Sequence, residues 1–326
     1  INVRSGNSGT KTISLGTGAD LTSTLSGKVT LDDNLILDAS GASAAASITL
    51  SGNIMDGVSG AKGLTKTSAG VVILSGTASD FSGNVAINAG ELRIANAAAL
   101  GNSTEITVGG SSNSAMTLTG GITAGSGKDI KIKGGGVGGF YGALATATSN
   151  TGTSEWQGSV TIDAATGTRI GSQAGTLKIS GNIGETTAGS QLIVRNSGSG
   201  ITVLSGNNSY EGSTDVLVGV LEIRSDGALG TTDVGTTVSS GQTLRLANNI
   251  TVTGESLSIT GADAAVTAPA LNNLSGNNTW TGALTVGNTT SFARIGSDAD
   301  KLTYSGTVTL SSTTSNAFVM QGNGDL

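Results

Sequence analysis

The 326-residue chain contains no cysteine and no histidine, only one proline, 3% aromatic residues and 12% charged residues. Without histidine and cysteine, Ser-His-Asp and Cys-His catalysis are impossible, and zinc or copper sites of the usual kind are not expected. Without cysteine there is also no disulfide framework. The small number of aromatic residues argues against a core of large rings, so the core has to come from small and β-branched residues.

The charge balance is mildly acidic. There are 16 Lys and Arg against 22 Asp and Glu, which gives a net charge of -6 and a pI near 4.6. Nucleic acid is therefore excluded as a main partner, because phosphate binding needs a concentrated basic surface. No apolar run is long enough to cross a bilayer, and no basic-then-apolar signal peptide opens the chain, which starts at Ile1 rather than Met. We expect a segment of a longer protein that meets a membrane only through an anchor outside these residues.

Glycine is abundant, with 53 residues, and one glycine-punctuated stretch, Leu64 to Gly101, occurs twice. Aligning Gly70 with Gly200 gives an offset of 130 (200 minus 70), and after one deletion the offset is 129. The matched positions include turn glycines, an aromatic residue and a three-residue motif: Gly83 and Gly212, Gly90 and Gly219, Phe81 and Tyr210, and Ala99-Leu100-Gly101 and Ala228-Leu229-Gly230. Such agreement marks an internal repeat.

Longer repeats extend this pattern. The stretch from Leu25 to Asp32 aligns with Trp156 to Asp163, and Arg169 to Ser172 returns as Arg294 to Ser297 at an offset of 125 (294 minus 169). These markers predict one continuous array over residues 1–326, with long repeats of about 25–154, 155–279 and a truncated 280–326. An elongated array of this kind can be stabilised by repetition instead of disulfides.

Short strands recur between Gly, Asn and Ser corners at intervals of about twenty residues, the size of one coil of a β-solenoid. From Lys128 to Lys133, Ile130 and Ile132 alternate with Lys131 and Lys133, which is the period of a strand. No apolar pattern at helical spacing persists over three turns. Antiparallel sandwiches or barrels have no reason to repeat residues at such offsets, so the sequence predicts an all-β, parallel β-solenoid.

The stretch 64–76, with Asp80 to Gly83, Ala89 to Ile94 and Ala99 to Gly101, resembles the autotransporter-associated β-strand repeat of bacterial secreted proteins. The copy at 194–230 is similar but less complete, because Asn196 stands where the motif prefers lysine. The resemblance implies a right-handed parallel β-helix that forms the passenger of an autotransporter or of a related giant surface protein. It implies secretion or display on the bacterial cell surface, and the family has no common enzymatic activity.

Carboxylates are the remaining candidates for chemistry. A glycosidase needs two carboxyl groups about 5 to 9.5 Å apart in a cleft, and a polysaccharide lyase needs clustered Asp ligands. We interpret the candidates as solvated turn and strand-end positions and predict no catalytic, cofactor-binding or metal-binding residue. The alternative function, a β-helical polysaccharide-degrading enzyme or a phage tailspike, stays open. The candidates are Asp32, Asp33, Glu155, Asp163, Asp298 and Asp300.

The region from 128 to 142 has no equivalent in the other repeats and is the candidate contact site. Its glycine-rich part is expected to bulge from the solenoid. The lysines could bind an acidic glycan, although charges that discourage strand pairing at a sheet edge are the favoured interpretation. The contact residues are Lys128, Lys131, Lys133, Phe140 and Tyr141.

The buried-looking aromatic residues have a different interpretation. Because Phe81, Tyr210, Trp156 and Trp280 recur before a glycine or its equivalent, we expect them to pack in corners rather than to bind sugars. The sequence as a whole predicts a non-enzymatic β-helical segment that serves as adhesin, stalk or extracellular matrix or fibre component. Glycans, a host surface, or other copies of the chain, end-to-end or lateral, are its expected partners.

Overall fold

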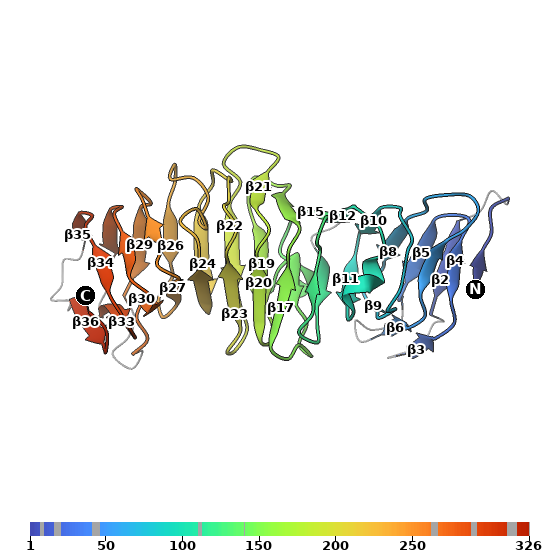
Figure 1. Cartoon of the computed structure of the whole chain (residues 1–326), viewed down its shortest axis with the longest axis horizontal. Helices are drawn as coiled ribbons and strands as arrows, with labels where there is room; N and C mark the ends of the chain where they lie inside the picture. Colours follow the sequence, from blue (N-terminus) through green and yellow to red (C-terminus); the bar gives the residue numbers. More distant parts are fainter. Residues whose placement is uncertain are drawn as a thin grey trace.

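A computed structural model describes residues 1–6, 10–15, 21–40, 46–109, 113–139, 141–261, 267–287, 292–311 and 318–325. The chain forms an elongated stack of short strands with its two termini at opposite ends (Figure 1). Two short 3-10 helices, η1 (Ala97–Leu100) and η2 (Val137–Gly139), interrupt the strands, and the described residues contain no α-helix. None of the described helices is long and apolar enough to span a membrane.

One sheet runs the whole length of the stack and is called the long sheet. Its 13 strands pair in parallel with their neighbours, and each step from one strand to the next is one turn of the chain, so the sheet spans twelve turns (13 minus 1). Its strands are β3 (Thr22–Leu25), β6 (Ser47–Leu50), β9 (Val71–Leu74), β11 (Gly90–Ile94), β13 (Ser114–Leu118), β16 (Leu144–Thr146), β19 (Thr168–Ser172), β22 (Leu192–Arg195), β24 (Thr214–Val218), β26 (Thr236–Val238), β29 (Leu257–Thr260), β32 (Leu284–Gly287) and β35 (Val308–Leu310).

Two further sheets cover the other sides over part of the length. The 8-stranded sheet contains β2 (Lys11–Ser14), β5 (Leu35–Asp38), β8 (Leu64–Thr67), β10 (Val85–Ile87), β12 (Glu105–Val108), β15 (Asp129–Ile132), β18 (Ser159–Ile162) and β21 (Ile183–Glu185). The 9-stranded sheet contains β14 (Thr123–Ala124), β17 (Thr153–Trp156), β20 (Thr176–Ile179), β23 (Ile201–Leu204), β25 (Val220–Ile223), β27 (Thr243–Ala247), β30 (Leu271–Ser275), β33 (Ala293–Ser297) and β36 (Phe318–Gly322).

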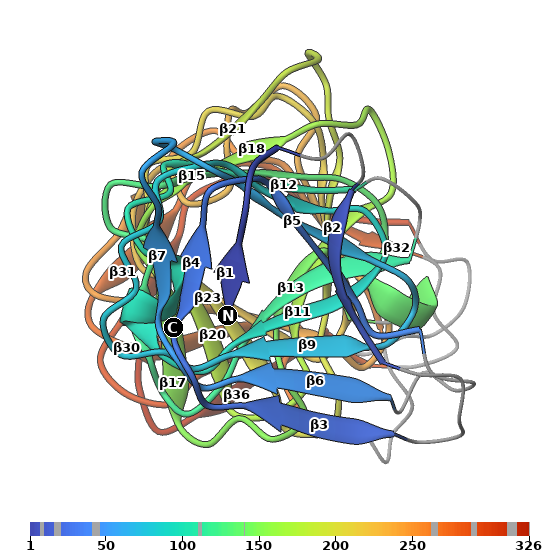
Figure 2. The same cartoon turned by 90° about the vertical axis from the view of Figure 1, so that its right-hand side faces the viewer.

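Two 3-stranded sheets complete the architecture. The N-terminal one contains β1 (Asn2–Val3), β4 (Val29–Leu31) and β7 (Ile54–Asp56), and the C-terminal one contains β28 (Thr251–Val252), β31 (Asn278–Trp280) and β34 (Leu302–Tyr304). Viewed from its N-terminal end, the stack has three sides (Figure 2). The prediction of an all-β parallel solenoid is therefore confirmed. Its right-handed sense and its division into three long repeats stay predictions.

The chain visits the three sides in a fixed order. The first side carries the 8-stranded sheet and later the C-terminal sheet, the second side carries the long sheet, and the third side carries the N-terminal sheet and later the 9-stranded sheet. One turn takes as few as 19 residues, between the paired residues Ile201 and Val220 (220 minus 201), and as many as 32, between Thr123 and Glu155 (155 minus 123). The predicted interval of about twenty residues is the lower end of this range, because corners of variable length are added to two or three short strands.

The core follows from the alternation of each strand. In β15, Ile130 and Ile132 are fully buried whereas Asp129 and Lys131 are exposed. Ile130 stacks between Ile106 on the preceding turn and Val160 on the following one. The inner turns therefore bury their apolar side chains against two neighbours, which is how a chain with so few aromatic residues forms a continuous core.

Polar side chains also stack inside the solenoid. The Thr146 hydroxyl lies 2.9 Å from the Ser172 hydroxyl, and the Ser172 backbone N–H donates to the Asn196 side-chain oxygen at 2.7 Å. All three side chains are buried. Because buried polar groups are costly unless they are hydrogen-bonded, these contacts fix which turn sits on which. The solenoid thus contains a buried ladder of polar side chains that runs across successive turns.

Candidate functional site

The two copies of the repeat share one construction. In the first, β8 and β10 lie in the 8-stranded sheet and β9 and β11 in the long sheet. In the second, β22 and β24 lie in the long sheet and β23 and β25 in the 9-stranded sheet. Each copy thus provides two turns that carry strands on two sides. The remaining side of those turns has no strand among its described residues, which are 75–84 and 95–104 in the first copy and 205–213 and 224–235 in the second.

The strand-free side is built by the aromatic residue and the Ala-Leu-Gly motif. Phe81 and Tyr210 are both 0% exposed. The carbonyl oxygen of Phe81 accepts a hydrogen bond from the Asn102 backbone N–H at 2.8 Å, and that of Tyr210 accepts one from Thr231 at 2.9 Å. The motif of one turn therefore stacks directly on the aromatic corner of the turn before it. Together with Trp156 and Trp280, which are also 0% exposed, these aromatics pack in the core as predicted and offer no ring for sugar stacking.

The buried side chain of Lys66 binds the backbone of a corner in the first copy. Its side chain is only 1% exposed, and its ammonium donates to the carbonyl oxygens of Thr67 at 2.5 Å, Ser68 at 2.7 Å and Ala89 at 3.1 Å. Burial lowers the pKa of Lys66 to about 8, while Asp38 and Glu91 act in the opposite direction. The three donors of an ammonium group match the three acceptors, so this lysine holds two successive turns together.

Asn196 occupies the equivalent position in the second copy and is 2% exposed. Its side-chain oxygen accepts hydrogen bonds from the Ser172 backbone N–H and, at 2.7 Å, from the Thr202 hydroxyl. Its amide nitrogen donates to the Val220 carbonyl oxygen at 2.8 Å. An amide both donates and accepts, so the second copy ties its turns with a different set of partners.

The predicted contact residues divide into two groups. The ammonium of Lys128 donates to the carbonyl oxygens of Gly101 at 2.8 Å and Ser103 at 2.6 Å, and burial lowers its pKa. Lys128 is therefore engaged with the preceding turn. Tyr141 is half-buried, and Phe140 lies outside the described residues. Lys131 and Lys133, in contrast, are exposed and come together on the outer face of the 8-stranded sheet.

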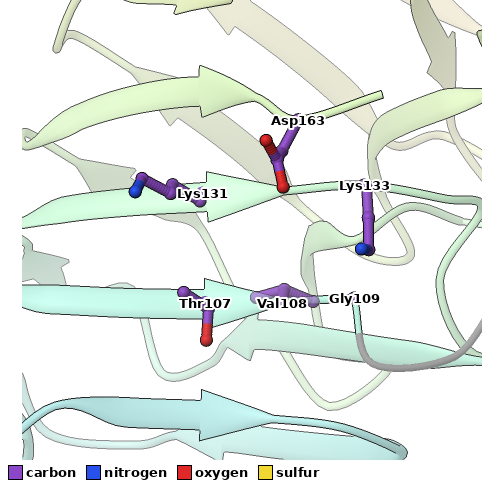
Figure 3. A pocket seen from close by; sticks show the side chains of 6 residues that line it. All are labelled: Thr107, Val108, Gly109, Lys131, Lys133 and Asp163. Atoms are coloured by element: carbon purple, nitrogen blue, oxygen red, sulfur yellow. The ribbon is translucent and has the colours of Figure 1, made fainter. Parts of the chain in front are cut away.

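These two lysines line an open groove of about 250 Å³ (Figure 3). Its walls come from three successive turns, because the Lys133 backbone N–H bonds to the Val108 carbonyl oxygen and the Asp163 N–H bonds to that of Ile132. The sequence had suggested Lys131, Lys133 and Asp163 separately but had not suggested Thr107, Val108 and Gly109. No sequence signal links these positions, since 24 residues separate Gly109 from Lys133 (133 minus 109) and 30 separate Lys133 from Asp163 (163 minus 133).

The other carboxylates considered for catalysis bond to neighbouring turns. Each has a partner one turn away: Asp32 the Val58 N–H, Asp33 the Lys11 ammonium, Glu155 the Lys178 and Ser180 side chains, Asp298 the Asn272 amide, and Asp300 the Gly276 N–H. Asp33 also accepts a hydrogen bond from the N–H of its chain neighbour Asn34 at 2.8 Å. Within the described ranges, no group of three or more acidic side chains is placed to hold a metal ion. These acidic side chains therefore contact adjacent turns individually.

Comparison with known proteins agrees with the two-copy construction. The Passenger-associated-transport-repeat family matches residues 64–94 and 196–223, which are the two segments just described. No curated protein and no solved structure matches the chain. Repeats of this family imply an autotransporter passenger, which is extracellular or exposed at the cell surface. The chain thus carries two passenger-associated transport repeats, characteristic of autotransporter-associated proteins, within a parallel β-solenoid.

Proposed function

We propose that the chain is a non-enzymatic, β-helical passenger segment that acts as an extended scaffold outside the cell, as an adhesin, a stalk or a component of an extracellular matrix or fibre. The observation that carries this proposal is that both transport repeats are built into one uninterrupted sheet of 13 strands. A rod of this kind holds distant surface groups at fixed spacings, which suits contact with a large partner such as a glycan or a host surface.

The use of charge supports a scaffold. Ion pairs join Lys131 to Glu105 at 3.4 Å and Lys178 to Glu155 at 3.1 Å, and in both cases the two side chains lie on successive turns. Glu155 is also bonded by the Ser180 hydroxyl at 2.6 Å. Charged groups arranged along the axis in this way strengthen the stacking of turns, whereas a hydrolytic site requires carboxyl groups that face one another across a cleft.

The experiment compares cells that produce the full-length protein with cells from whose gene the segment for residues 1–326 has been deleted in frame. We expect antibodies against the segment to label intact wild-type cells, and we expect the deletion to reduce attachment to glycan-coated surfaces while the rest of the protein is still exported. Unchanged attachment, with export of both forms verified, would contradict an adhesive role.

The same purified segment is incubated with a panel of polysaccharides. We expect no release of reducing ends and no unsaturated products. Cleavage that disappears when Asp163 or Glu155 is replaced by its amide would overturn the non-enzymatic proposal and favour a β-helical polysaccharide-degrading enzyme. The glycan and self-association partners stay predictions until such binding is measured.

A further inference from the structure

The groove beside Lys133 brings two lysines and a carboxylate together on the outer surface of the solenoid. It is formed where β12 and β15 end and where the chain leaves β18 (Figure 3). Its volume of about 250 Å³ is below the roughly 300–1,000 Å³ of clefts that enclose drug-sized ligands. The space therefore suits one ring of a longer, surface-bound chain better than a whole small molecule.

Glycine at position 109 makes the groove. Gly109 has φ +140°, and a Cβ atom there would lie 2.2 Å from Cγ of Lys133 and 2.8 Å from its Cε. The lysine stem can lie across the end of β12 only because this side chain is missing. The ammonium of Lys133 is thereby held beside the groove on a stem that packs against backbone, instead of extending freely into solvent.

The three charged side chains of the groove differ in how many ion pairs and hydrogen bonds they form. Lys131 is paired with Glu105 at 3.4 Å, and Asp163 accepts a hydrogen bond from the Thr186 hydroxyl at 2.8 Å through one of its two oxygens. For Lys133, no ion pair or side-chain hydrogen bond is formed with any other described residue. The groove thus offers one unpaired cation, a second cation that is weakly held, and a carboxylate with acceptor capacity to spare.

We propose that this groove binds a sugar residue that carries a carboxylate, such as a uronic acid within an acidic polysaccharide. The ligand carboxylate would accept from the ammonium group of Lys133, and the ring hydroxyls beside it would donate to Asp163, with the short Thr107 leaving room for the ring. The Lys131 ammonium points away from Lys133 (Figure 3) and would add only long-range attraction. A simple polyanion fits less well, because Asp163 and Glu105 would repel additional negative charge. This inference deepens the proposed adhesive function and rests on the chain being exposed outside the cell.

The test measures binding of the purified chain to a short oligogalacturonate by calorimetry at low and at physiological salt. The ligand control is the methyl ester of the same oligosaccharide, whose carboxyl groups are neutral. We expect binding of the acid and weakening of at least about tenfold for the ester, because the charge-assisted hydrogen bonds are lost. Equal binding of acid and ester would overturn the proposal.

Two variants test the geometry. Lys133→Met is expected to weaken binding about tenfold, while Lys301→Met, which removes an exposed lysine outside the groove, is expected to leave it unchanged. Circular dichroism and the melting temperature verify that both variants fold. Equal affinity of Lys133→Met and the wild type would contradict the assignment.

Asp163→Asn distinguishes a site that binds a sugar through its hydroxyls from a site that attracts any anion. Removing this negative charge strengthens the binding of any anion if electrostatics alone is at work, but weakens the binding of a sugar whose hydroxyls donate to the carboxylate. We expect a loss of about threefold. Tighter binding, or full competition by inorganic phosphate, would show a nonspecific anion site and overturn the proposal. These measurements use purified protein, so their outcome is independent of the cell-attachment experiment. The purified chain can fail to bind the acidic sugar while cells still need the segment for attachment, and it can bind the sugar while cells attach without the segment.

Discussion

The two transport repeats have the same plan on different sides of the solenoid. The first places its strands in the 8-stranded sheet and the long sheet, and the second places its strands in the long sheet and the 9-stranded sheet. From β8 the chain makes five turns to β21 on the same side, through β10, β12, β15 and β18, and β22 then lies on the next side. The motif therefore specifies strands on two sides of each turn and a third side without strands, but it does not specify which sides these are.

The two copies also solve one hydrogen-bonding problem with different chemistry. Lys66 gives three donors to three carbonyl oxygens, whereas Asn196 accepts from Ser172 and Thr202 and donates to Val220. Both side chains form direct hydrogen bonds with backbone groups of a tight corner. The comparison teaches that the position must be polar and buried, while its identity is set by the neighbouring turns.

The largest difference should appear at the glycine where the third strand of each copy passes into the fourth. Gly90 and Gly219 both have positive φ. A Cβ on Gly90 would lie 2.3 Å from the Ser68 carbonyl oxygen and 2.5 Å from that of Gly70, whereas on Gly219 its nearest neighbour is a side-chain atom at 2.8 Å. We expect Gly90→Ala to lower the free energy of unfolding by about 4 kcal/mol and Gly219→Ala by about 2 kcal/mol.

Amide hydrogen exchange in β11 and β25 measures these losses locally, which is needed because a repeat array does not have to unfold in one step. Gly120→Ala is the matched control, since Gly120 has φ +78° but open space around its Cβ position. It should show only the backbone strain of about 1 kcal/mol. Equal losses for Gly90→Ala and Gly120→Ala would mean that the carbonyl oxygens close to Gly90 do not add to the cost of a Cβ atom there.

Exchanging the two polar residues is the next test. Lys66→Asn places a side chain too short to reach the carbonyl oxygen of Ala89, and Asn196→Lys brings an ammonium against the Ser172 N–H, which is itself a donor. We expect each substitution to cost about 3 kcal/mol, because buried partners are left unpaired. Urea denaturation with exchange protection of the adjoining strands provides the measurement, and Lys131→Asn serves as a surface control. Stabilities within about 0.5 kcal/mol of the control would refute the idea that the turns fix the residue's identity.

The smallest expected effect is a pH dependence of local stability between about pH 5 and pH 8 that is present near the second copy and absent from the first. Glu255, which is 3% exposed, accepts from the Thr236 hydroxyl at 2.7 Å near the second copy. Burial raises its pKa to about 7. The unfolded chain loses this proton near its ordinary pKa of 4.5, so between these values the folded state binds more protons and stability falls as pH rises. From pH 5 to pH 8 we expect a loss on the order of 2 kcal/mol around β26 and β29.

Glu255→Gln should remove this pH dependence while β9 and β11 in the first copy are unaffected. Lys66 gives the opposite slope at higher pH, because a lowered folded pKa of about 8 makes stability rise between about pH 8 and the ordinary lysine pKa. Hydrogen exchange corrected for its intrinsic pH dependence measures both slopes. A uniform pH response along the stack would argue against local control by these two residues.

Much of the fold could be predicted from residues that repeat. The alternation around Ile130 and Ile132 and the paired glycines Gly90 and Gly219 identify strands, corners and a stacked arrangement. The side occupied by each copy could not be predicted, because it depends on the summed lengths of all intervening turns. Those lengths vary with the corners, which have little pattern of their own.

The candidate groove shows the same limit. Lys128, Lys131 and Lys133 look alike in the sequence, yet the Lys128 ammonium is bound by carbonyl oxygens of the preceding turn and the other two reach the outer face. Asp163 joins them only through the stacking of β18 on β15. Contacts between turns depend on register, and a single sequence gives register only where the residues themselves repeat.

The second repeat is displaced by one side relative to the first. The number of strands and corners between two repeats therefore sets the rotation about the solenoid axis that relates them. A spacer that adds a whole turn between two such repeats lengthens the rod but leaves their strand-free corners in the same relative orientation. One that adds only a strand and a corner rotates the second repeat by about a third of a revolution. Along a longer passenger, insertions and deletions of a strand and a corner would therefore change the direction in which a strand-free corner faces. They would do so with little change in its distance from the next such corner along the axis.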